Sequence, residues 1–384
     1  MTRAQAKATC GAALALTAAL ACACQSPGAT VAQPRVTGTT HASTSPGGSG
    51  HVRAERQVAL PPGRVGHVTL AGERVFIAVG TGSHSPDRVL VADPGTRRTR
   101  ELARTAWRGG LMDWVEATGD TVVFTDQDRE QSDAERDTRW RMYALDLATG
   151  RRRVLASSGN RATAWVPLPR AMESQVVWAQ PGTAPGRFTE FVWAPGQSAP
   201  RAVLRDAQLQ PGTESVTAHQ LVYVGPPASA RGAGGDIYAL DLTAGSRPRQ
   251  LTATGLVMRS WARGGHVVWE NHIGPAEDPA VEHLDDPYSH WAAPLAQPGS
   301  ARRLQHGYSS GNVVVGDTFA AWLEQDGRIG VAALDGSWHT TIDAEGGASV
   351  PARLAADGPR LAYGTTATGA DGVERTTVTV VRVS

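Results

Sequence analysis

One segment, residues 270–290, holds the densest group of imidazole and carboxylate side chains in the sequence. Such side chains together could hold a divalent cation. They lack the spacing of a strand or helix metal motif, and three prolines indicate an irregular loop. We therefore assign no metal site and keep the segment as a candidate for ligand contact. Its candidate residues are His272, Asp278, His283, Asp285 and Asp286.

Three tryptophans form a second group of candidates. Trp114, Trp165 and Trp261 each precede a short apolar run, near the start of an expected inner strand. An exposed indole there could stack on a sugar or a peptide, whereas a buried one would fill the core. Both interpretations stay open at this point.

No catalytic constellation marks this sequence. It contains no Gly-x-Ser-x-Gly elbow, phosphate-binding loop or dinucleotide fingerprint. A charged stretch at residues 126–137 lacks the glycine and the final glutamate of a calcium loop, so a solvated loop is the simpler interpretation. We expect no cofactor and assign no catalytic residue.

The first residues are typical of an export signal. Arg3 and Lys7 precede an apolar run that is too short to span a membrane. Cys22 and Cys24 each follow small residues and resemble the cleavage point of a bacterial lipoprotein, although leucine is missing three places before either one. We expect a signal peptide over residues 1–21 and a lipid anchor on Cys22 or Cys24, on the outer face of the cell membrane. Simple secretion is the alternative.

Composition separates a tether from a folded body. Residues 25–50 are mostly Ser, Thr, Gly and Pro, so they bury too little apolar area to offset their conformational entropy. We expect a flexible linker over residues 22–52 and one domain over residues 53–384, which contains no cysteine. The net charge of +1 argues against nucleic-acid binding, which needs a basic face.

The body is built from a repeat. Short apolar runs that follow a turn and end in an aromatic residue recur about every 48 residues, a period that suits a four-stranded propeller blade. The terminal aromatics are Phe76, Phe124, Trp178, Tyr223, Trp269, Trp322 and Tyr363. A second strand, clearest at residues 142–151 and 237–246, follows each of them. The pattern predicts an all-β, seven-bladed β-propeller, with six or eight blades as alternatives.

The seventh unit ends before its last strand. Residues 55–60 have the pattern of an outer strand and belong to no unit of their own. Since open sheet edges are liabilities, we expect this N-terminal strand to complete the C-terminal blade and to close the ring.

These repeats resemble the TolB-like and WD40-like propeller repeats of exported bacterial proteins. Residues 354–363 match the Trp-Ser-Pro-Asp-Gly half of that repeat, with Leu for Trp and Ala for Pro. Residues 142–151 and 237–245 match the half that ends in a Thr-Gly turn. The resemblance covers about 330 residues and implies a propeller, whose fold serves many roles.

The loops suggest which face binds. In a propeller the loops between second and third strands emerge on one face, and here most of them are long, at residues 81–87, 126–139, 180–189, 224–235, 270–289 and 364–374. Long loops on a rigid scaffold often bind ligands. We expect a monomeric, non-enzymatic module that binds a protein or a cell-wall glycan on this face. The alternative is a channel-mouth enzyme, a hydrolase or lyase acting on a sugar or lactone.

Overall fold

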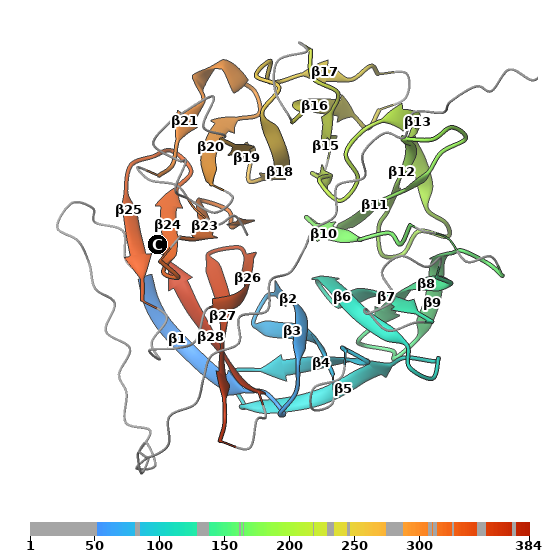
Figure 1. Cartoon of the computed structure of the whole chain (residues 1–384), viewed down its shortest axis with the longest axis vertical. Helices are drawn as coiled ribbons and strands as arrows, with labels where there is room; N and C mark the ends of the chain where they lie inside the picture. The colour runs from blue at the N-terminus through green and yellow to red at the C-terminus, as the bar shows by residue number, and fades with distance from the viewer. Residues whose placement is uncertain are drawn as a thin grey trace, which may run out of the picture. The chain divides into compact units, whose positions relative to one another are not determined.

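The structure is a computed structural model that describes residues 52–80, 85–128, 138–160, 163, 165–217, 219–228, 234–243, 246–273, 287–305, 309, 313–324, 326–343, 351–370 and 374–384. Within these residues the strands form seven antiparallel sheets of four strands each. The sheets stand as blades around a common centre (Figure 1). The predicted seven-bladed β-propeller is confirmed, and the alternatives of six or eight blades are wrong.

The first three blades run from the innermost to the outermost strand in chain order. The first consists of β2 (Val65–Ala71), β3 (Arg74–Val79), β4 (Arg88–Asp93) and β5 (Arg98–Arg104). The second consists of β6 (Leu111–Thr118), β7 (Thr121–Gln127), β8 (Trp140–Asp146) and β9 (Arg152–Ser157). The third consists of β10 (Arg170–Met172), β11 (Gln175–Pro181), β12 (Arg187–Trp193) and β13 (Arg201–Gln208).

The next three blades repeat this order. The fourth consists of β14 (Ser215–Val216), β15 (Gln220–Gly225), β16 (Asp236–Asp241) and β17 (Arg249–Gln250). The fifth consists of β18 (Val257–Arg263), β19 (His266–His272), β20 (Tyr288–Pro294) and β21 (Arg302–Arg303), with the short 3-10 helix η3 (Pro298–Ser300) before its last strand. The sixth consists of β22 (Val314–Val315), β23 (Phe319–Leu323), β24 (Ile329–Ala333) and β25 (His339–Ile342).

The seventh blade joins the two ends of the propeller. It consists of β26 (Pro351–Asp357), β27 (Arg360–Thr368), β28 (Glu374–Val383) and, outermost, β1 (Val52–Ala59). β1 pairs antiparallel with β28 from Val52↔Val383 to Ala59↔Thr377, interrupted by a bulge near Glu55. The predicted closure by the N-terminal strand is therefore confirmed.

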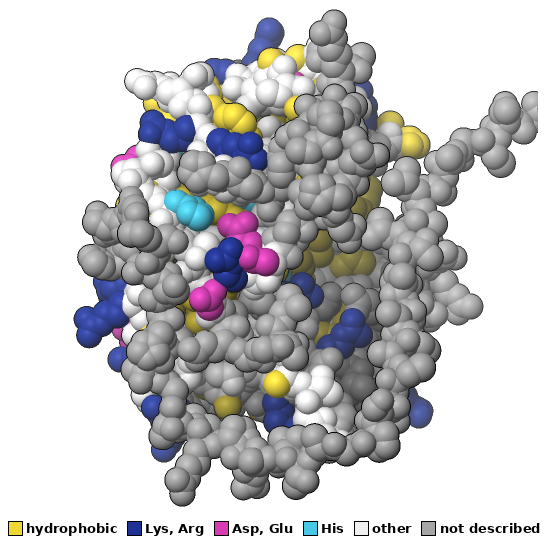
Figure 2. Space-filling model, turned by 60° about the vertical axis from the view of Figure 1, so that its left-hand side comes forward, with side chains coloured by type: hydrophobic (Ala, Val, Ile, Leu, Met, Phe, Trp, Pro, Cys, Tyr) yellow, Lys and Arg dark blue, Asp and Glu magenta, His cyan; other side chains and the backbone are white. Residues whose placement is uncertain are grey.

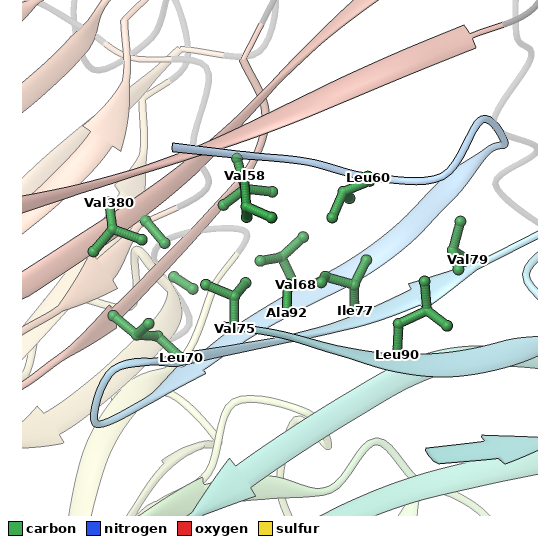
Figure 3. Close-up of a cluster of buried hydrophobic side chains, with 13 residues drawn as sticks. Val58, Leu60, Val68, Leu70, Val75, Ile77, Val79, Leu90, Ala92 and Val380 are labelled. Carbon is green, nitrogen blue, oxygen red and sulfur yellow. The ribbon is translucent and has the colours of Figure 1, made fainter. Parts of the chain in front are cut away.

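The core lies between the blades. Seven clusters of buried apolar side chains fill the seven interfaces between neighbouring blades. At the closing interface, Val58 and Leu60 face Val68 and Ile77 of the first blade (Figure 3). The second strand of each blade is buried on both faces, which is why its apolar run is continuous rather than alternating.

The repeat's aromatic residues all fall on these second strands. They lie on β3, β7, β11, β15, β19, β23 and β27, and each is at most 5% exposed. Trp178, Trp269 and Trp322 belong to clusters between blades, as the repeat predicts. The tight turns after the first strands are also confirmed: Gly72 and Gly119 adopt positive φ angles of 60° and 55° there.

Two of the expected long loops are shorter than predicted. β11 runs to Pro181 and β12 starts at Arg187, and β27 runs to Thr368 before β28 starts at Glu374. Polar residues at these positions resembled a loop in the sequence, but they pair across the hairpins. The ends of these strands are solvated, so they need no apolar pattern. The long-loop face is thus built mainly by the first, second, fourth and fifth blades, whose loops lie partly outside the described residues.

Candidate functional site

The first strands of all seven blades surround a central channel. The cavity has a volume of about 630 Å³ and is lined by β2, β6, β10, β18, β22 and β26, together with residues 210–213 before β14. This volume falls within the range of roughly 300–1,000 Å³ that is common for ligand sites. The wall combines arginines and aromatic rings with apolar side chains such as Leu168, Met172 and Val314.

Three channel side chains share one depth. Glu116, Arg170 and Trp261 each pair with a valine that directly precedes the aromatic anchor of its blade, namely Val123, Val177 and Val268. Their side chains come from the second, third and fifth blades. The Arg170 guanidinium lies over the Trp261 ring, with Cζ 5.5 Å from the ring centroid, a cation–π contact.

Several channel side chains also connect neighbouring blades. Each donates a hydrogen bond to a backbone carbonyl oxygen in the inner strand of the next blade or just before that strand. The pairs are His67 Nδ1 to Val115 (2.7 Å), Trp114 Nε1 to Pro169 (2.7 Å), Arg170 Nη2 to Gly212 (3.0 Å) and Arg353 Nε to Gly66. Inner strands leave backbone groups unpaired at the channel, and these bonds satisfy some of them.

An acid and an imidazole meet in the channel wall. Glu116 accepts a hydrogen bond from the Thr69 hydroxyl (3.3 Å), and its other oxygen lies 3.9 Å from His67 Nε2. Burial raises the pKa of Glu116 to about 7, although Arg170 opposes this shift. Burial lowers the pKa of His67 to about 3. At neutral pH the imidazole is therefore neutral and Glu116 is about half protonated.

Four guanidinium groups border the same space, those of Arg170, Arg259, Arg263 and Arg353. Burial lowers the pKa of Arg170, although the charges of Glu116 and Glu214 oppose this shift. Arg259 Nη1 lies 3.7 Å from Glu270 Oε2. Among the described residues, Arg170 and Arg353 have no carboxylate within 4.0 Å. The channel therefore has the chemistry to hold an anionic group.

The predicted tryptophans divide into two kinds. Trp114 and Trp261 line the channel, but each ring already packs against other side chains of the protein. Trp114 stacks on His67 with centroids 4.0 Å apart, and Trp261 is 5% exposed and packs between the fifth and sixth blades. Trp165 does not line the channel: its Nε1 donates to the Ala179 carbonyl (3.3 Å) and its ring packs edge-on against Phe188. Ligand contact by these rings stays a prediction.

The remaining predicted residues lie elsewhere. His272 ends β19, with its ring 5.6 Å from that of Tyr288, and is not a channel residue. Asp278, His283, Asp285, Asp286, Cys22 and Cys24 lie outside the described residues. Among the residues that the structure describes, no group of three or more His, Cys, Asp or Glu side chains could hold a metal ion. The same part of the chain contains no helix long and apolar enough to cross a membrane.

Sequence reasoning missed the charged channel residues. His67, Glu116, Arg170, Arg259 and Arg353 all lie eight to ten residues before the aromatic anchor of their blade. An alignment of the units on that anchor would have revealed polar side chains at a position where a closed core needs apolar ones. That signal was present in the sequence, although it does not say what the charges bind.

Comparison with known proteins supports the fold. The chain matches no protein-family model and no curated protein. Among solved structures, the β-propeller domain of the Trilobed protease from Pyrococcus furiosus has a TM-score of 0.50 at 11% identity, covering 81% of this chain and 90% of that one. That domain has an open velcro topology, whereas here β1 closes the ring.

Two further solved structures are matched over a smaller share of their own length. A prolyl endopeptidase has a TM-score of 0.50 at 12% identity, covering 84% of this chain and 47% of that chain, so this chain spans about half its length. TolB from Acinetobacter baumannii has a TM-score of 0.45 at 12% identity, covering 68% and 61%. The chain thus shares the fold of the β-propeller domain of the Trilobed protease.

Proposed function

We propose that this protein is a binding module whose partner docks on the long-loop face and inserts a group into the central channel. The observation that carries this proposal is the channel itself, whose wall brings cationic, aromatic and apolar side chains from separate blades to one space. Such a mixed wall orients a ligand by its polar groups and holds it by its apolar ones.

The partner class follows from the expected location. The N-terminal sequence indicates export and a lipid anchor at Cys22 or Cys24, so the partner would be a protein or a cell-wall glycan of the envelope. The net charge of +1 favours a partner other than nucleic acid, and near the centre of the face in Figure 2 arginine and acidic side chains lie side by side.

Site-specific photocrosslinking in intact cells tests this function. A photoreactive residue at Met172, in the channel wall, is compared with one at Val154, which is 49% exposed on the outer strand β9. We expect a discrete crosslinked species from position 172 alone. Equal or absent crosslinking from both positions would reject the channel as the binding site.

A second candidate function has one observation in its favour. A carboxyl group with a pKa of about 7, as for Glu116, suits a general acid at neutral pH, so the channel could house a hydrolase or lyase acting on a sugar or lactone. Glu116→Gln should then abolish turnover of a screened glycan or lactone while leaving the fold intact. Unchanged turnover in this variant would remove Glu116 from any such mechanism.

A further inference from the structure

Two of the four channel arginines have no carboxylate in direct contact among the described residues. Arg259 has Glu270 as its ion-pair partner at 3.7 Å, but Arg170 and Arg353 have no described carboxylate at that range. The Nε of Arg170 is buried and, among the described residues, has no hydrogen-bond partner. Glu116, Glu214 and Glu270 act on Arg170 only from beyond ion-pair distance, and Arg353 is exposed. A buried guanidinium without a carboxylate in direct contact costs free energy, so Arg170 is the group that calls for a further interaction.

Hydrogen bonds between blades use only some of the N–H donors of these two arginines. Arg170 donates one hydrogen bond to Gly212 and Arg353 donates one to Gly66, and each bond links two blades. A guanidinium carries five N–H donors, so both retain donors that can reach into the channel. Neutral donors such as Trp114 make the same kind of link without introducing charge. The positive charge is therefore not required for the link between blades.

We propose that the channel binds an oxyanion, a carboxylate or a phosphate, between Arg170 and Arg353, and that protonated Glu116 donates a hydrogen bond to it. This inference rests on the proposed function, because it takes the channel as the binding site. Guanidinium groups bind both oxyanions through paired N–H donors. The ring of Trp261 beside Arg170 and the side chains of Leu168 and Met172 would contact an apolar body attached to the anion.

Glu116 makes the binding depend on pH. The charged or titratable groups around it are Arg170 on the neighbouring blade and His67 beside it, with Arg259 and Arg353 elsewhere in the wall and the buried Glu214 and Glu270 near Arg170. His67 stays neutral near pH 7, and burial raises the pKa of Glu214. Glu116, with a pKa of about 7, therefore changes charge at neutral pH: above that pH its carboxylate repels the anion and no longer donates a proton.

Calorimetric titration of the purified full chain tests this proposal with three probes of similar shape. Benzoate and phenyl phosphate carry oxyanions, and benzamide is the neutral counterpart. We expect both anions to bind at least about ten-fold more tightly than benzamide. We also expect benzoate, which stays ionised throughout, to bind about ten-fold more weakly at pH 8 than at pH 6. The preferred anion distinguishes a carboxylate source from a phosphate source, and either preference supports the proposal.

Substitutions test which residues bind benzoate and which one makes the binding depend on pH. Arg170→Gln and Arg353→Gln should each weaken benzoate binding at least about ten-fold, and Glu116→Gln should abolish the difference between pH 6 and pH 8. Arg104→Gln, on the outer strand β5 and 51% exposed, is the matched control and should bind like the wild type.

Two results would overturn the proposal: benzamide binding as tightly as benzoate, or folded Arg170→Gln and Arg353→Gln variants with wild-type affinity. Crosslinking from position 172 without any preference for anions would reject this inference and leave the proposed function standing. Anion binding without a crosslinked partner would support anion binding in the channel and reject the proposed docking of a partner there.

Discussion

Two arginines of the same channel have opposite surroundings. Arg263, at the end of β18 next to the strand turns, donates to Asp317 (2.9 Å), to Asp357 and to the Ala356 carbonyl (3.3 Å). Burial acts to lower the pKa of Arg263, but the bonds to Asp357 and Asp317 outweigh it and raise the pKa. Arg170 has one carbonyl partner and a lowered pKa. The charge of one guanidinium is saturated by two carboxylates, and the other has no described carboxylate in direct contact.

The saturated arginine belongs to a chain of contacts through four blades. Arg263 of the fifth blade contacts Asp317 of the sixth and Asp357 of the seventh, and Asp357 accepts a hydrogen bond from the Gly72 backbone N–H of the first (2.7 Å). Such a chain stabilises the ring in addition to the apolar packing and the other hydrogen bonds between blades. The comparison teaches that charge in a propeller channel serves the fold where it is fully paired and is available to a ligand where it is not.

Removal of the closing strand should have the largest effect on stability. Deletion of residues 53–61 removes Val58 and Leu60 from the core and exposes the edge of β28. We expect a loss of more than about 5 kcal/mol, because two large buried side chains and a full strand pairing disappear together. Thermal and urea unfolding measure this loss. An unchanged Tm would show that β1 is dispensable for closure.

Arg263→Ala should cause the next largest loss of stability. It tests the arginine whose charge is paired with two carboxylates. Loss of this guanidinium leaves two carboxylates facing each other, and we expect a cost of about 2–4 kcal/mol, less than for a deeply buried pair because Asp317 is 55% exposed. Urea unfolding is the measurement, with Arg104→Ala as a surface control that should cost less than about 1 kcal/mol. Equal costs for the two variants would remove the special role of Arg263.

Glu116→Gln should change how stability depends on pH. The folded pKa of about 7 lies above the usual value of 4.5, so the folded wild type binds the proton more tightly than the unfolded chain does. Wild-type stability relative to Glu116→Gln should therefore fall as the pH rises from about 4.5 to 7, by up to about 3 kcal/mol. Urea unfolding of both proteins at several pH values measures this difference. A difference that does not vary with pH would mean that Glu116 ionises normally.

Arg170→Met should have the smallest effect on stability and so separates the two arginines. Methionine loses the bond to Gly212 but also removes the desolvation cost of an unpaired guanidinium, so we expect a change within about 1 kcal/mol, in either direction. Benzoate binding should nevertheless be lost. A destabilisation as large as that of Arg263→Ala would instead make Arg170 a structural residue, and the contrast between them would disappear.

The sequence predicted the architecture better than the site. The aromatic anchors and the unpaired strand at residues 55–60 favoured seven blades and predicted their closure, because each anchor occupies the same buried strand. The loops at residues 180–189 and 364–374 were overestimated, since solvated strand ends have no apolar pattern. Of the predicted tryptophans, Trp114 and Trp261 reached the channel and Trp165 did not.

By itself, the sequence determined the repeat and the strand that closes the ring, and it favoured seven blades while leaving six or eight open. These follow from the recurring turn and aromatic residue and from the period of about 48 residues. Only the tertiary structure decided which side chains meet. Glu116, Arg170 and Trp261 lie far apart in the chain but at one depth of the channel, where the register of three different hairpins brings them together. The unpaired charge arises from that convergence, since burial acts on a group only after its neighbours have been brought into contact with it.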